Sequence, residues 1–167
     1  MSITNPKELF LHELSDQLNC EQTLVGVLGT LAQEVDDQEF RSALEKHQQQ
    51  TREHVQRLER AFQVLGSQPE KVTCFGAQGL KQEHDNFASK ESPSKQMLTM
   101  FDTGAGEKTE HYEITAYKGL IEKAQLMGQQ EVASLLQQNL QDEEWMAHTT
   151  HKIATRLAKQ ALAGAGV

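Results

Sequence analysis

Apolar residues recur every three or four positions along most of the chain, which is the spacing of an amphipathic helix. No segment alternates with the two-residue period of a half-buried strand. Each of the three prolines disfavours helical geometry in the residue before it, and Gly66 and Gly128 follow long periodic segments as C-terminal caps do. The pattern predicts an all-α chain with four long helices, at about residues 7–35, 38–65, 95–127 and 129–162, and a short helix at about 72–88.

The lengths of the connections predict how these helices are arranged. The first two long helices are joined by a very short connection, and so are the last two, so each pair should fold as an antiparallel hairpin. The connection between the two pairs is long and carries the short helix. This layout is that of a ferritin-like four-helix bundle with one long crossover, and we expect residues 1–167 to form a single ferritin-like domain.

Ionisable residues interrupt the apolar stripes of all four long helices. On a helical wheel they lie at or near the centre of each stripe: Glu21 on the first helix, His47 and His54 on the second, Glu110 and Glu113 on the third, and Glu143 with its neighbour Glu144 on the fourth. The wheel leaves open whether Glu143 or Glu144 points inward, because adjacent positions differ by about 100°.

A carboxylate that is buried without a partner loses its hydration at a large cost in free energy, and no Lys or Arg lies on these four faces. A single core-facing Glu or His is usually a hydrogen-bonded core residue, but one such residue on every long helix favours a bound cation. Oxygen and imidazole ligands together suit iron, manganese or zinc. The other candidates are interpreted as core or surface residues: His12, His84, His111, Tyr112, Tyr117, Cys20 and Cys74.

Charge and composition argue against several kinds of binding partner and against a secreted or membrane-spanning protein. The formal net charge is −8 and the chain has no run of Lys and Arg, which argues against nucleic acid and against anionic membrane surfaces. No apolar run reaches the roughly 20 residues of a membrane span. Residues 1–15 lack the features of a signal peptide, and two cysteines are too few for a disulfide framework, so we expect a cytoplasmic protein.

Five segments together resemble the YciE/YciF family of bacterial stress proteins. They are LFLHELSDQLNCEQTL, ALEKHQQQTREHVQRLE, EHYEITAYKGL and LLQQNLQDEEWMAH from the long helices, and CFGAQGLKQE from the crossover. The resemblance extends from about residue 6 to residue 158. It implies a ferritin-like fold, a dinuclear metal site, a tendency to form homodimers, and a set of ligands: Glu21, His47, Glu110, Glu113 and one of Glu143 and Glu144.

The chain departs from the family pattern in its second long helix. Members usually carry Glu-Thr where this chain has Gln50-Thr51, and the common Glu-x-x-His element of di-iron sites is missing. His54, one turn further along, could substitute for the missing carboxylate as a ligand.

These features lead to one main hypothesis of function and two others. The main hypothesis is a di-metal carboxylate protein of bacterial stress response, with two irons per chain, or manganese or zinc instead, that reacts with O₂ or peroxide. Whether it is an enzyme stays open. The alternative is a non-catalytic stress or interaction protein with a structural or vestigial metal site. A spherical iron-storage or DNA-protecting shell is disfavoured, because the second long helix lacks a spaced Asp-x-x-x-Glu and the chain has no basic tail.

Overall fold

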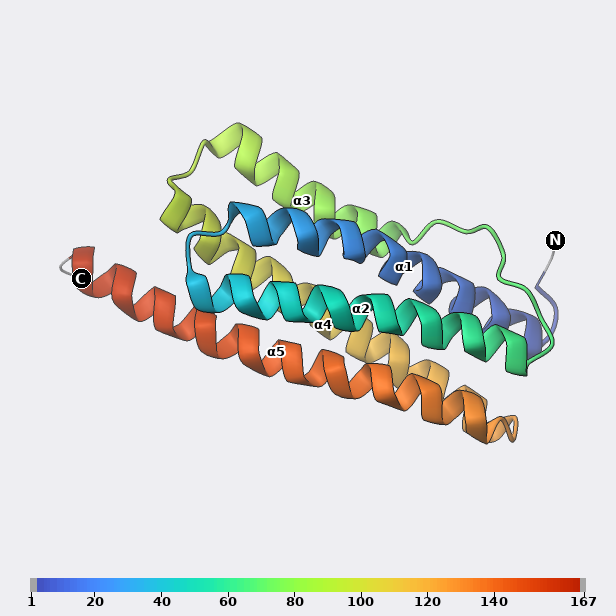
Figure 1. Ribbon diagram of the computed structural model, residues 1–167. Coiled ribbons are helices and arrows are strands. Elements are labelled where there is room, and N and C mark those ends of the chain that lie inside the picture. The colour runs from blue at the N-terminus through green and yellow to red at the C-terminus, as the bar shows by residue number, and fades with distance from the viewer. Residues whose placement is uncertain (1–2, 166–167) are drawn as a thin grey trace.

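The structure is a computed structural model that describes residues 3–165 (Figure 1). Within this range it contains five helices and no strand: α1 (Pro6–Glu34), α2 (Gln38–Val64), α3 (Phe75–Glu91), α4 (Lys95–Leu126) and α5 (Gln130–Ala165). The prediction of an all-α bundle of four long helices with a helical crossover is confirmed. Residues 1–2 and 166–167 of the expected domain lie outside the described residues.

Local signals in the sequence explain where the first hairpin begins and turns. Pro6 occupies the first turn of α1, and the side chain of Asn5 caps this helix by accepting from the backbone N–H of Glu8 at 3.0 Å. Asp37 caps α2 in the same way, by accepting from the N–H of Phe40 at 2.9 Å. After α2, Gly66 adopts a φ of 60°, a left-handed conformation that costs glycine little.

Three helix boundaries, in two helices, differ from those expected by more than one residue. Helix α3 begins at Phe75 and runs to Glu91, later at both ends than the predicted 72–88. Its start is late because the segment before it is held by a tertiary contact. There the backbone N–H of Cys74 donates to the side-chain oxygen of Asn19 in α1 at 2.8 Å. Helix α5 continues past the expected end near residue 162 to Ala165.

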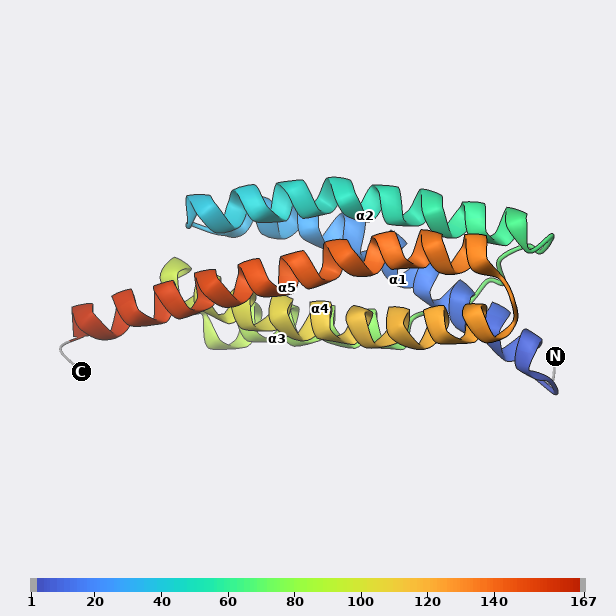
Figure 2. The ribbon, with the colours of Figure 1, turned by 90° about the horizontal axis from the view of Figure 1, so that it is seen from below.

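The four long helices pack as two antiparallel hairpins, α1 with α2 and α4 with α5, and α2 also packs against α5. Helix α3 lies on the outside of the bundle, against α1 and α4, and carries the chain back to the end at which α4 starts (Figure 1). In both views the C-terminal end of α5 projects beyond the other helices (Figure 2). None of the described helices is long and apolar enough to cross a membrane.

The apolar core of the bundle consists of two large clusters rather than one. The first contains Phe10, Phe62 and Leu136, near the start of α1, and the second contains Phe40 and Met146, near the end of α1. On α1 and α2 the buried ionisable residues lie between positions of the two clusters, and on α5 Glu143 lies between Leu140 of the first cluster and Met146 of the second. A polar layer therefore crosses the middle of the bundle, and the candidate site is in this layer.

Candidate metal centre

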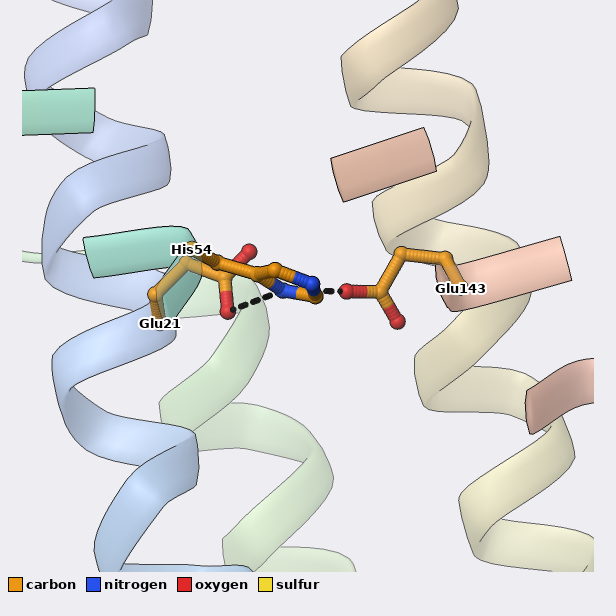
Figure 3. Close-up of side chains that lie close together, drawn as sticks. All are labelled: Glu21, His54 and Glu143. Carbon is orange, nitrogen blue, oxygen red and sulfur yellow. Dashed lines mark hydrogen bonds and ion pairs between the residues drawn. The ribbon is translucent and has the colours of Figure 1, made fainter. Parts of the chain in front are cut away.

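Two groups of three potential ligands meet in the polar layer, and Glu143 belongs to both. The first group joins Glu143 to Glu21 and His54, and the second joins it to His47 and Glu110. Figure 3 shows His54 lying between the carboxylates of Glu21 and Glu143. All five side chains are buried, with at most 2% of any residue exposed.

The two oxygens of Glu143 face different histidines. Its Oε1 lies 2.9 Å from Nδ1 of His54, whereas its Oε2 lies 3.3 Å from Nε2 of His47. The remaining carboxylates complete the two groups. Glu21 Oε2 is 3.3 Å from Nδ1 of His54, and Glu110 Oε2 is 3.3 Å from Nε2 of His47. This arrangement suits a carboxylate that bridges two neighbouring cations.

The distances between histidine nitrogens and carboxylate oxygens fit bound metal ions, and so do the carboxylate oxygens that accept no hydrogen bond. Two ligand atoms about 2.1 Å from one tetrahedral metal lie roughly 3.4 Å apart, close to the separations between the histidine nitrogens and the carboxylate oxygens. Within the described residues, both oxygens of Glu143 and Oε2 of Glu110 are buried without a hydrogen bond. Buried polar atoms are nearly always satisfied, so these oxygens are the ones that a bound cation would use.

Glu113 and Glu144, the other two predicted ligands, have different positions. Glu113 is buried beside both groups, and its Oε1 accepts from Nε2 of Gln17 at 3.2 Å. The Glu144 side chain is 49% exposed and pairs with Lys118 at 3.2 Å, on the outside of the bundle. Of the two adjacent glutamates, Glu143 points inward, and Glu144 is not part of the cluster.

The ring nitrogens that face away from the cluster also have partners. Nε2 of His54 lies 3.2 Å from Oδ2 of Asp142, and Nδ1 of His47 lies 3.5 Å from Oε1 of Gln50. Gln50 donates in turn to Oδ1 of Asp142 at 2.7 Å, and Arg57 donates to Oδ2 at 3.2 Å. Outward N–H groups held in this way leave the inward nitrogens free to bind a metal.

Gln50 therefore contacts His47, a candidate ligand, on the side that faces away from the cluster. No Lys or Arg is expected at the centre of these faces, and Arg57 lies beside the cluster rather than at the centre of a face. Arg57 reaches the edge of the cluster through Asp142, although it contacts none of the carboxylates of the two groups. It lies on α2 three residues after His54, on the flank of the helix that the wheel treats as outside the apolar stripe.

Two further buried residues support the cluster from the side of Glu21. Tyr117, interpreted from sequence as a core aromatic, donates its hydroxyl hydrogen to Oε1 of Glu21. Asn139 donates to the Tyr117 hydroxyl oxygen at 2.9 Å. The sequence signal for these residues is helical spacing: Asn139 lies one turn before Glu143, and Tyr117 one turn after Glu113.

Burial and mutual repulsion set the charges of the metal-free cluster. Burial raises the pKa of Glu110 to about 8 and that of Glu113 well above its ordinary value. Burial alone would lower the pKa of His54, but the negative charge of Glu21 and the close contact with the Glu143 carboxylate raise it to about 10. The protons on the histidines thus offset part of the carboxylate charge in the metal-free protein, and a metal ion must displace them.

Replacing Asp142 with asparagine is expected to weaken metal binding by about 10- to 100-fold, because the outward nitrogen of His54 loses its charged partner. Competition with a chromophoric chelator measures this change. The control is Glu53→Gln, which removes the exposed partner of Arg57 on the other side. Equal affinities of Asp142→Asn and the unmodified chain would contradict a role for Asp142 in orienting His54.

Comparisons with known proteins agree on one family and one fold. The family model described as "Domain of unknown function (DUF892)" matches residues 5–163. Protein YciF of Escherichia coli (strain K12) is 26% identical over 148 residues, which cover 86% of this chain and 87% of YciF. The crystal structure of the E. coli stress protein YciF superimposes with a TM-score of 0.86 at 22% identity, covering 94% of this chain and 99% of that one. YcfI from Rhodopseudomonas palustris also gives a TM-score of 0.86, at 28% identity over 90% of this chain and 95% of YcfI.

Proposed function

Since this chain belongs to the DUF892 family, we propose that it is a ferritin-like di-metal carboxylate protein of bacterial stress response. The proposal assigns two irons to each chain, with manganese or zinc as alternatives. The stress response enters through the similarity to YciF of E. coli, which is described as a stress protein. Action in the cytoplasm and as a homodimer is part of the same proposal.

The position of Glu143 is the observation that carries the proposal. Its two oxygens face His54 and His47 separately, and each histidine nitrogen also has a second carboxylate oxygen at 3.3 Å. Two adjacent three-ligand positions that share one carboxylate support the proposal of a dinuclear site.

The charge balance supports two divalent ions. The cluster contains four buried carboxylates, which carry four negative charges when they are ionised: those of Glu21, Glu110, Glu113 and Glu143. The two histidines add no charge when they are neutral. Two divalent cations neutralise this set, whereas one would leave two negative charges buried at a large cost. The proposed ligand set is therefore complete without a carboxylate at Gln50.

The residues of this chain would hold and isolate such a pair of ions. The apolar clusters on either side of the polar layer exclude water, and the hydrogen bond from Tyr117 fixes the orientation of Glu21. Asp142 and Gln50 accept the outward N–H groups of the two histidines. Bound iron or manganese would supply the electron transfer needed to react with O₂ or peroxide.

A non-catalytic protein with a structural site is the second candidate, and one observation favours it. His54 Nδ1 and Glu143 Oε1 are 2.9 Å apart, which is also the distance of a hydrogen bond between a histidinium and a carboxylate. The cluster can therefore persist as an ion-pair network without metal.

Metal content separates the candidates. Untagged protein is loaded anaerobically with Fe(II), freed of unbound iron and analysed by plasma mass spectrometry, and we expect about two irons per chain. Loaded protein is then supplied with peroxide or O₂, and consumption is followed by electrode. Two irons with turnover support the main proposal, and two irons without turnover support the structural role. A folded chain that binds no metal would contradict the main proposal and support a vestigial site that persists as an ion-pair network.

A further inference from the structure

The two cysteines of the chain lie together outside the ligand set. Cys20 is in the middle of α1 and Cys74 is the residue before α3, and both are fully buried. They form a small cluster with Leu24 and Ala77, separate from the two large apolar clusters. The crossover brings the two thiols into contact across a long stretch of sequence, although neither belongs to the proposed metal groups.

The surroundings of Cys74 favour a thiolate. Its Sγ lies 3.4 Å from the hydroxyl of Tyr112, and it occupies the N-cap position of α3, where the helix dipole favours negative charge. Gly76 allows this approach, because a Cβ at that position would lie 2.6 Å from the Tyr112 hydroxyl oxygen.

The two thiols are electrostatically unequal. Hydrogen bonding from Cys20 is the largest of the influences that lower the pKa of Cys74 to about 6, and Tyr112 acts in the same direction. Cys74, at the N-terminus of α3 and beside the Tyr112 hydroxyl, is therefore the sulfur placed to attack an oxidant, and Cys20 is the neighbouring thiol that can react with it afterwards.

We propose that Cys20 and Cys74 form a redox-active dithiol that peroxide oxidises to an intramolecular disulfide. The Cys74 thiolate attacks one oxygen of hydrogen peroxide, breaks the O–O bond and becomes a sulfenic acid, and hydroxide leaves. The sulfur of Cys20 then attacks Sγ of Cys74, and the hydroxyl of the sulfenic acid leaves with the Cys20 proton as water. Two thiols lose two electrons, and one peroxide gains them.

The position of Cys74 determines how peroxide reaches the thiol and what a disulfide would change in the structure. Its sequence neighbours Thr73 and Phe75 are exposed, with Phe75 78% exposed, so the thiol lies just beneath the surface of the crossover. The disulfide would tie α1 to the start of α3. It would also remove the S–H group of Cys20, whose sulfur lies 3.9 Å from Oε1 of Glu113. The inference goes beyond the proposed function, because it needs no metal.

The test uses the metal-free full chain. Peroxide is added in excess under anaerobic conditions, remaining thiols are counted after denaturation, and tryptic peptides are mapped by mass spectrometry without reduction. We expect both thiols to be lost and a peptide of residues 8–41 to be linked to one of residues 72–81 within one chain. Dithiothreitol should restore both thiols. Retention of both thiols, or links only between chains, would overturn the proposal.

Single variants assign the roles of the two sulfurs. In Cys20→Ser, Cys74 should accumulate as a sulfenic acid that dimedone traps, whereas in Cys74→Ser the buried Cys20 should react at least about 10-fold more slowly. Equal trapping at both positions would contradict the assignment.

Repeating the wild-type experiment on iron-loaded protein separates this inference from the proposed function. A chain that binds no metal but forms the disulfide refutes only the function, and a chain that binds two metals but keeps its thiols refutes only the dithiol.

Discussion

Replacing Glu143 with glutamine is expected to abolish binding of both metal ions rather than one. The amide keeps the size of the side chain but removes the charge that faces His47 and His54, so each three-ligand group loses a member. We expect affinity to fall by more than about 100-fold at both positions, since direct ligands matter more than the residues that orient them. Iron content after anaerobic loading measures the loss, and circular dichroism checks that the helices persist.

Two kinds of control make this result specific. Glu144→Gln changes the neighbouring residue, which is exposed and pairs with Lys118, and should bind two irons as the unmodified chain does. Glu21→Gln and Glu110→Gln each remove a ligand from one group only, and each should lower the content toward one iron per chain. Full iron content in Glu143→Gln, or its loss in Glu144→Gln, would show that the shared carboxylate has been wrongly assigned.

The second prediction concerns the stability of the fold, which we expect to depend on pH only when the metal is absent. We expect the melting temperature of the metal-free chain to fall between about pH 7 and pH 10. A group whose pKa is raised by folding stabilises the fold below its unfolded-state pKa, and this stabilisation is lost as the pH rises through the folded-state value. For His54 these two values are 6.5 and about 10.

The two glutamates that face His47 affect the stability over other pH ranges. Glu110, whose pKa rises from 4.5 to about 8, loses its contribution in the same direction as the pH rises. Burial opposes ionisation of Glu143, but the charge of His47 lowers its pKa, so its stabilising effect is present above pH 4.5 and is lost only in acid. The contribution of Glu110 is therefore lost between about pH 4.5 and pH 8 and that of His54 between pH 6.5 and about pH 10, while that of Glu143 stays constant.

Scanning calorimetry of metal-free and metal-loaded protein measures this effect. We expect the metal-free melting temperature to fall by on the order of 10 °C across the window. The loaded protein should change little, because its histidines are already deprotonated and bound. If the melting temperatures of the metal-free and metal-loaded proteins changed with pH in parallel, the metal would not be replacing the protons of the cluster.

The helices and most of the cluster could be predicted from sequence because they depend on local rules. The cap at Asn5 and the turn at Gly66 need only backbone chemistry, and the inward position of Glu21 needs only the period of one helix. The choice between Glu143 and Glu144 could not be made in this way. It depends on how α5 is rotated against its neighbours, and the structure places Glu144 beside Lys118, a surface residue of α4.

Other features depend on contacts between elements that no single helix records. Asp142 meets His54 only because α5 packs against α2 at one register, and the Gln50 amide reaches the same carboxylate from the side. Cys20 meets Cys74 because Asn19 holds the backbone of the crossover, which also delays the start of α3. Helical periodicity contains no information about either contact.

The division of the core into two apolar clusters has a consequence for cooperative unfolding. Each cluster can keep its helix ends together by itself, while the layer between them gains little from apolar burial and bears the cost of its charges. Without metal, we therefore expect the middle of the bundle to open first and its two ends to behave as separate foldons. Bound metal would join four helices at that point and merge the two foldons into one unit.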